Sequence, residues 1–176
     1  MSFQHIDIFK TTRKYQPGTI VIWQGETANE LFLVKSGCIR AWFNKDGKDI
    51  TLQFFFEGDM ATALESFLHH VPSDIFLEAI EETEVMVVDR ETFLMLIKED
   101  QMIKDWFYEE AIKKLLAHTH RLLSLLQHKP FERYQQLLAG DTRILRRVPQ
   151  QYIASYLGIT PVSLSRIRYR KKSNHS

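Results

Sequence analysis

The side chains best suited to chemistry gather near the C-terminus, where hydroxyl and basic groups recur at helical spacing. They are Thr160, Ser163, Ser165, Arg166, Tyr169, Arg170 and Lys171. An arginine can donate two parallel hydrogen bonds to O6 and N7 of guanine, and hydroxyl groups near a helix N-terminus bind phosphate. This pattern predicts binding to double-stranded DNA. Arg166 would contact a base, and Thr160 and Ser163 would contact phosphate.

Two short helices joined by a tight turn are needed to position these side chains. The apolar positions that would pack the two helices together are Ile153, Ala154, Leu157, Leu164 and Ile167. Gly158 permits a sharp turn, Thr160 can cap the second helix, and Pro161 suits its first turn. A short turn that contains glycine is typical of a helix-turn-helix.

Charge is divided unevenly along the chain of 176 residues, although the net charge is only +1. Residues 1–129 carry a net charge of −6 and residues 130–176 carry +7. A basic end on an acidic body indicates a polyanionic partner for that end. A solvated basic tail is the alternative that charge alone leaves open.

A long helix is predicted from about Asp100 to Gln127, a stretch without proline or glycine. A heptad seam with spacings of 4, 3, 4, 3 and 4 consists of Tyr108, Ile112, Leu115, Thr119, Leu122 and Leu126. Such a seam favours pairing with a second copy of the chain, and an ordinary core helix is the alternative. Phe107, Leu116 and Leu123 widen this stripe on one side, and Lys129-Pro130 marks the end of the helix.

The first ninety or so residues have the pattern of short strands separated by turns. The apolar and β-branched runs are Thr19–Trp23, Leu31–Val34, Cys38–Phe43, Ile50–Phe56, Ile75–Ile80 and Glu84–Asp89. Turns every 8–12 residues favour a sandwich or barrel. The fold class predicted is α+β, with a β-rich N-terminal domain, a long helix and a small C-terminal domain.

Composition excludes several classes of protein. A single cysteine, Cys38, allows neither an internal disulfide nor a cysteine-ligated metal cluster within one chain. The apolar runs are too short for a membrane span, and the N-terminus lacks the apolar region of a signal peptide. The histidines lack the spacing of metal ligands, so we expect no metal site. We also expect no cofactor, no membrane partner and no enzymatic activity. A reducing cytoplasm is the expected compartment.

The chain resembles the Crp/Fnr family of bacterial transcription regulators. The resemblance rests on residues 153–161 with 164–167, on Glu57-Gly58-Asp59 followed by Phe67, and on the strand and turn of residues 31–37. It implies a cyclic-nucleotide-binding-like, jelly-roll-like β-roll over 1–99, a dimerisation helix over 100–129 and a DNA-binding domain over 130–176. The last domain would be winged-helix-like, with its wing short or absent. The resemblance also implies a homodimer that binds double-stranded DNA and RNA polymerase.

The pocket implied by this resemblance departs from the family pattern. Members that bind cyclic nucleotides hold the ribose with a Gly-Glu pair and the cyclic phosphate with an Arg-Ser pair. Thr62 and Ala63 occupy the first pair of positions here, and Ser73 and Asp74 occupy the second. Without the carboxylate and the guanidinium, we expect a degenerate pocket that does not respond to cAMP. The effector is therefore unknown.

A second hypothesis belongs to another class of function. The chain could be a small-molecule-binding or cupin-like β-roll protein whose basic tail is incidental. A DNA-binding regulator should bind bulk DNA with an affinity that falls steeply as salt is added, and a β-roll enzyme should not.

Overall fold

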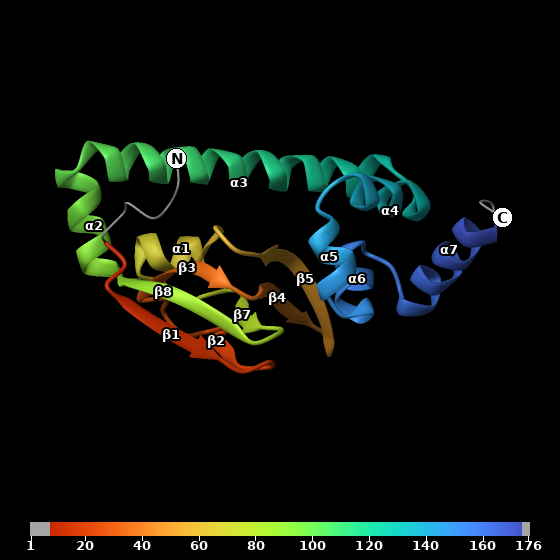
Figure 1. Cartoon of the computed structure of the whole chain (residues 1–176), viewed down its shortest axis with the longest axis horizontal. Helices are drawn as coiled ribbons and strands as arrows, with labels where there is room; N and C mark the ends of the chain where they lie inside the picture. The colour runs from red at the N-terminus through yellow and green to blue at the C-terminus, as the bar shows by residue number, and fades with distance from the viewer. Residues whose placement is uncertain (1–7, 174–176) are drawn as a thin grey trace. The chain divides into compact units, whose positions relative to one another are not determined.

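Figure 1 shows the computed structural model of the chain, which describes residues 8–173 and the side chains as far as Tyr169. The strands are β1 (Thr11–Tyr15), β2 (Ile20–Ile22), β3 (Glu30–Ser36), β4 (Ile39–Lys45), β5 (Lys48–Phe55), β6 (Met60–Ala61), β7 (Phe76–Ala79) and β8 (Thr83–Asp89). The helices are α1 (Leu64–His69), α2 (Arg90–Glu99), α3 (Gln101–Gln127), α4 (Pro130–Ala139), α5 (Thr142–Arg147), α6 (Gln150–Tyr156) and α7 (Pro161–Ser173).

These elements form two compact units. The first comprises the chain up to Phe43 together with Leu52–Lys113. The second comprises Asn44–Thr51 and the chain from Lys114 onward. The tip of the β4–β5 hairpin therefore belongs to the C-terminal unit, although it lies in the middle of the predicted β-roll sequence.

The jelly-roll-like β-roll implied by the family resemblance is confirmed, and it agrees with the sandwich or barrel that the strand pattern favoured. The described strands form two four-stranded sheets, in the orders β1-β8-β3-β6 and β2-β7-β4-β5. Neighbours in both sheets are mostly distant in sequence, as in a jelly roll: β1 pairs antiparallel with β8 from Thr11↔Val87 to Tyr15↔Thr83. The apolar runs did not reveal β1, which is mostly polar, β6 and α1, which are short, or the ten-residue helix α2.

The roll has a continuous apolar core. All four residues of Leu31–Val34 are buried, because the roll covers both faces of β3. The start of α3 joins this core through Ile103 and Phe107, and the Phe107 ring packs edge-on against Phe93 with centroids 5.3 Å apart. Phe107 is thus packed in its own unit, although the sequence placed it beside the dimerisation seam.

The turn between β3 and β4 requires glycine at position 37. Gly37 has φ +95°, and a Cβ there would lie 2.5 Å from the carbonyl oxygen of Glu82. Neither the dihedral angle nor the space tolerates a larger residue. This close approach brings the backbone of Cys38 to Thr83, whose hydroxyl accepts a hydrogen bond from the Cys38 N–H at 3.1 Å.

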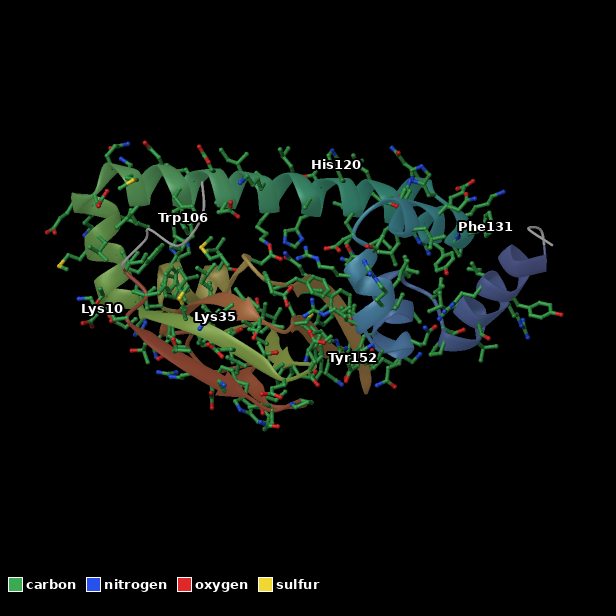
Figure 2. All side chains as sticks on the ribbon, viewed as in Figure 1. Lys10, Lys35, Trp106, His120, Phe131 and Tyr152 are labelled. Atoms are coloured by element: carbon green, nitrogen blue, oxygen red, sulfur yellow. The ribbon has the colours of Figure 1, made fainter. Side chains whose placement is uncertain are left out.

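Helix α3 matches the long helix predicted from the sequence, and side chains project from it along its length (Figure 2). The Asp100 carboxylate precedes it and accepts from the Met102 N–H at 2.8 Å. The seam residues Tyr108, Ile112, Leu115, Thr119, Leu122 and Leu126 are all exposed, Leu126 by 75%. A row of exposed leucines on one helix face is unusual for a chain that stays alone in water.

Candidate nucleic-acid interface

Helices α6 and α7 form the helix-turn-helix predicted from the sequence. Residues 157–160 join them, and the Ile159 N–H donates to the Ala154 carbonyl at 3.0 Å within this turn. Ile153, Ala154 and Leu164 are buried to 1% exposure or less, so the two helices pack through the predicted positions. Ala154 leaves no side-chain bulk between them, which permits a close crossing.

Gly158 allows the chain to turn between the helices. Its φ is +65°, a left-handed conformation that side chains with a Cβ rarely adopt. A Cβ at this position would also lie 3.3 Å from Cδ2 of Leu125 on α3. Gly158 therefore lets the chain turn into α7 and also leaves room for the Leu125 side chain of α3.

Thr160 caps α7 as the sequence predicted. Its hydroxyl accepts a hydrogen bond from the Ser163 N–H at 3.2 Å and donates to the Ser163 hydroxyl at 3.0 Å. The two residues expected to bind phosphate thus contact each other, at the helix end where backbone N–H groups attract anions.

One face of α7 is exposed to solvent. It presents Val162, Ser165, Arg166, Arg168 and Tyr169, with Val162 60% exposed and Tyr169 74% exposed. Arg170 and Lys171 were also predicted to bind DNA, and their side chains lie outside the described residues. Segment 161–176 contains no Asp or Glu, so the positive charge of this face is not neutralised from within its own helix.

The tip of the β4–β5 hairpin is held against α6 by Ser155. The Ser155 hydroxyl accepts from the Thr51 N–H at 2.8 Å and donates to the Asp49 carbonyl at 2.7 Å. Arg121 of α3 reinforces the contact, because its Nη2 donates to the carbonyls of Thr51 and Tyr156, both at 2.9 Å. We call this group of contacts the hairpin clasp.

Aromatic packing and burial add to the hairpin clasp. The Arg121 guanidinium lies over the Tyr156 ring, 4.4 Å from its centroid, which is a favourable cation–π distance. Burial lowers the pKa of Arg121 and raises that of the Tyr156 phenol. Arginine stays charged at neutral pH even so, because its ordinary pKa is far above 7.

Helix α4 supports the helix-turn-helix from outside it. Arg133 of α4 donates from Nε to the Leu157 carbonyl at 2.9 Å and from Nη1 to the His128 carbonyl at 2.8 Å.

Asp141 caps α5 and pairs with Arg143 at 2.7 Å, and this hydrogen-bonded ion pair lowers the pKa of the Asp141 carboxyl.

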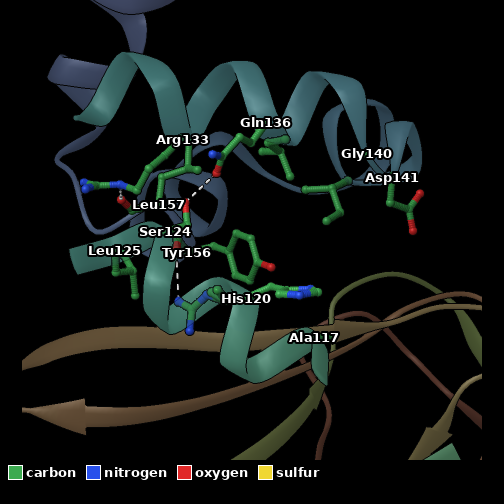
Figure 3. A pocket seen from close by; sticks show the side chains of 13 residues that line it. Ala117, His120, Ser124, Leu125, Arg133, Gln136, Gly140, Asp141, Tyr156 and Leu157 are labelled. Atoms are coloured by element: carbon green, nitrogen blue, oxygen red, sulfur yellow. Dashed lines mark hydrogen bonds between the residues drawn. The ribbon is translucent and has the colours of Figure 1, made fainter. Parts of the chain in front are cut away.

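A cavity of about 280 Å³ lies among α3, α4, α5 and α6 (Figure 3). Apolar walls come from Leu125, Leu137 and Ile144, and Ser124 donates to Gln136 beside them. This volume is just below the range of about 300–1,000 Å³ that ligand pockets usually have. The cavity is therefore best described as a gap among the supporting helices.

Two of the four side chains at the predicted effector positions hydrogen-bond to the backbone of the roll. Thr62 donates to the Glu30 carbonyl at 2.9 Å, and Ala63 is buried. Ser73 is 3% exposed and donates to the Ile75 carbonyl at 2.7 Å. Asp74 is exposed and brings a negative charge to this segment.

The first unit has three arginines, and each contacts a group of the protein itself. Arg13 forms a two-pronged ion pair with Glu30, both hydrogen bonds being 2.6 Å long. Arg40 is fully buried and lies 3.2 Å from the Glu78 carboxylate. Arg90 donates to the last carbonyls of α1. A hollow of about 400 Å³ in this unit is lined by three carboxylates, those of Glu26, Glu30 and Asp89, and, among the described residues, by no cationic side chain.

Sequence comparison identifies the roll. The profile of the cyclic nucleotide-binding domain matches residues 12–100. The anaerobic regulatory protein of Bacillus subtilis is 28% identical over 89 residues, which cover 50% of this chain and 37% of that relative. The match thus spans well under half of the length of this curated relative.

Solved structures share the fold over nearly the whole chain. FixK2 from Bradyrhizobium japonicum superposes with a TM-score of 0.83 and 20% identity, covering 94% of this chain and 85% of that one. A chain from Eubacterium rectale, classed as a transcriptional regulator of the Crp/Fnr family, gives a TM-score of 0.73 and 21% identity, covering 93% of this chain and 79% of its own. At such identities the likeness establishes the fold.

A β-roll, a long helix and a C-terminal helix-turn-helix in this order define the architecture of the Crp/Fnr regulators. The chain belongs to the cyclic nucleotide-binding domain family, and the resemblance seen in its sequence is confirmed.

Sequence reasoning missed Ser155 and Arg121 as structural residues. Ser155 lies inside the predicted helix-turn-helix, but its partner Thr51 is 104 positions away. No local spacing rule connects the two positions. Arg121 is one of several polar residues in the second half of α3, so its type and position alone did not mark it out.

None of the helices among the described residues is long and apolar enough to cross a membrane. Within the same residues, no three His, Cys, Asp or Glu side chains come together as a metal site would require.

The hairpin clasp predicts the effect of replacing Ser155. Ser155→Ala removes a donor and an acceptor that hold the Thr51 N–H and the Asp49 carbonyl, so unfolding should require about 2 kcal/mol less free energy. Ser165→Ala, at an exposed position of α7, should change stability by less than about 0.5 kcal/mol. Urea unfolding of the two variants measures the difference, and equal stabilities would contradict the role of Ser155.

Proposed function

We propose that this protein is a sequence-specific, DNA-binding transcription regulator of the Crp/Fnr type. The observation that carries the proposal is the exposed basic face of α7, held by a capped and tightly packed helix-turn-helix. In such motifs the second helix enters the major groove and its N-terminal residues reach the base edges. RNA polymerase would then be the partner through which bound DNA affects transcription.

Charge supports the same proposal. The C-terminal 47 residues carry a net charge of +7, whereas the preceding 129 carry −6. Positive side chains displace counterions from DNA, so binding through this end should weaken steeply as salt is added. The cupin-like alternative predicts no such dependence.

The DNA test compares two arginines of the same helix. Arg166→Ala should weaken binding to a selected duplex by about 1–3 kcal/mol, because a bidentate contact to guanine is lost, and should affect random DNA much less. Arg168→Ala removes the same charge two residues away and should weaken binding to the selected and the random duplex about equally. Fluorescence anisotropy over a salt series measures the affinities of the wild type and both variants for the two duplexes.

The outcomes separate the hypotheses. An unchanged ratio of selected to random affinity in Arg166→Ala would remove its role in base recognition. Salt-independent binding, or none, would favour the β-roll protein with an incidental tail.

We also propose that the chain acts as a homodimer through α3. Its exposed seam would bury Leu115, Leu122 and Leu126 against the same residues of a second copy, in a parallel pair about a two-fold axis. Two helix-turn-helix motifs related in this way suit a pseudo-palindromic site with half-sites about 34 Å apart.

The dimer test places charges on the seam. Leu115→Glu combined with Leu122→Glu would bury four unpaired carboxylates in the dimer, which costs far more than the seam gains. Analytical ultracentrifugation should report a folded monomer that binds DNA weakly. His120→Glu combined with Gln127→Glu adds the same charge at exposed positions off the seam and should remain dimeric. A dimeric seam variant would place the interface elsewhere.

The effector, if the regulator has one, is proposed not to be cAMP or cGMP. A cyclic phosphate buried in the roll would lose its hydration without gaining a guanidinium, because Arg13, Arg40 and Arg90 are held by other groups. Asp74 and the acidic surroundings make the local potential still less favourable for an anion.

Titration calorimetry tests this directly. Neither cAMP nor cGMP should give saturable binding below about 10 μM, a threshold equal to about −7 kcal/mol. Saturable 1:1 binding tighter than this would show that the roll has kept a phosphate site.

A further inference from the structure

Val162 is the exposed apolar residue closest to the start of α7. It is 60% exposed, whereas Val34 and Val85 in the core of the roll are at most 1% exposed. Val162 and Arg166 are four residues apart on one helix, so their side chains are neighbours on the same face. Whatever surface meets Arg166 therefore also meets an isopropyl group.

The major groove offers one apolar group to such a side chain, the C5-methyl of thymine. The other base edges present hydrogen-bond donors and acceptors, which lose water without replacement when valine covers them. Reading cytosine N4 requires a hydrogen-bond acceptor, and the side chain of valine has none. The chemistry of this position therefore favours thymine.

The first turn of α7 holds Val162 in place. Pro161 fixes the backbone at the helix start, and Thr160 caps it. The Leu164 N–H donates to the Thr160 carbonyl at 3.0 Å, and the Leu164 side chain is fully buried. Valine in a helix keeps mainly one side-chain rotamer. Contact with a methyl group would thus cost little conformational entropy.

We propose that Val162 is a specificity-determining residue that reads a thymine methyl, within one or two base pairs of the guanine contacted by Arg166. Four helical residues rise about 6 Å and one base step rises about 3.4 Å, which sets this separation. The proposal rests on the proposed function, since it concerns the same DNA-binding face.

The test begins with a duplex selected from a random library by the full-length protein. Each thymine of the half-site is then replaced in turn by uracil, which keeps base pairing and removes only the C5-methyl. One position near the guanine contact should lose about three- to fivefold in affinity, the effect of uncovering one methyl group. The other thymines should show little change.

Val162→Ala completes a thermodynamic cycle. Because Val162 is exposed, the variant should unfold at the wild-type temperature, and a melting curve checks this. It should bind the thymine duplex more weakly than the wild type and should no longer distinguish thymine from uracil at that position. Ser165→Ala, on the same DNA-binding face, is the matched control: any loss of affinity should be the same for the thymine and uracil duplexes, so the discrimination should remain.

The possible failures are distinct. A selected site that lacks thymine near the guanine, or a uracil effect that persists unchanged in Val162→Ala, would overturn the role of Val162 and leave DNA binding intact. A selection that enriches no duplex would overturn the proposed function, and the reading of thymine with it.

Discussion

One serine hydroxyl fixes the arrangement on which the C-terminal unit depends. Buried backbone groups need hydrogen-bond partners, and at the hairpin tip an N–H and a carbonyl are both satisfied by Ser155. Because Ser155 belongs to α6, its two bonds set how that helix lies on the hairpin. Helix α7 is in turn set by its packing on Ala154 and by the turn at Gly158. The face that α7 presents is thus the last step of a chain of constraints that begins at the hairpin.

The parts of the structure that follow from local rules could be predicted. Alternating and β-branched runs located most of the strands, and the stretch without proline or glycine located α3 to within a residue at each end. Leu164 and Gly158 identified the helix-turn-helix, because a buried leucine and a left-handed glycine are local requirements. Thr160 was recognised as a cap for the same reason. In each case the residue type and its neighbours contain the necessary information.

The remainder depends on contacts between distant segments. The hairpin tip belongs to the C-terminal unit because Thr51 meets Ser155, and nothing in residues 44–51 signals this. Strand β1 consists mostly of polar residues, since one edge of the roll faces water, so its pairing with β8 had no apolar pattern to reveal it. The contacts of Ser73 and Asp74 likewise depend on how the roll folds around them, because a shared fold does not fix the chemistry of a site.

The hairpin clasp also bears on how far the C-terminal unit is modular. Segments excised from Lys114 onward would lack residues 44–51, so the Ser155 hydroxyl would lose the backbone it holds and Arg121 would lose one of its two carbonyls. The unit is therefore discontinuous in sequence, and a single truncation could not isolate it as one contiguous segment. Any recombination that grafted this DNA-binding end onto another β-roll would have to supply a hairpin of matching length and backbone register.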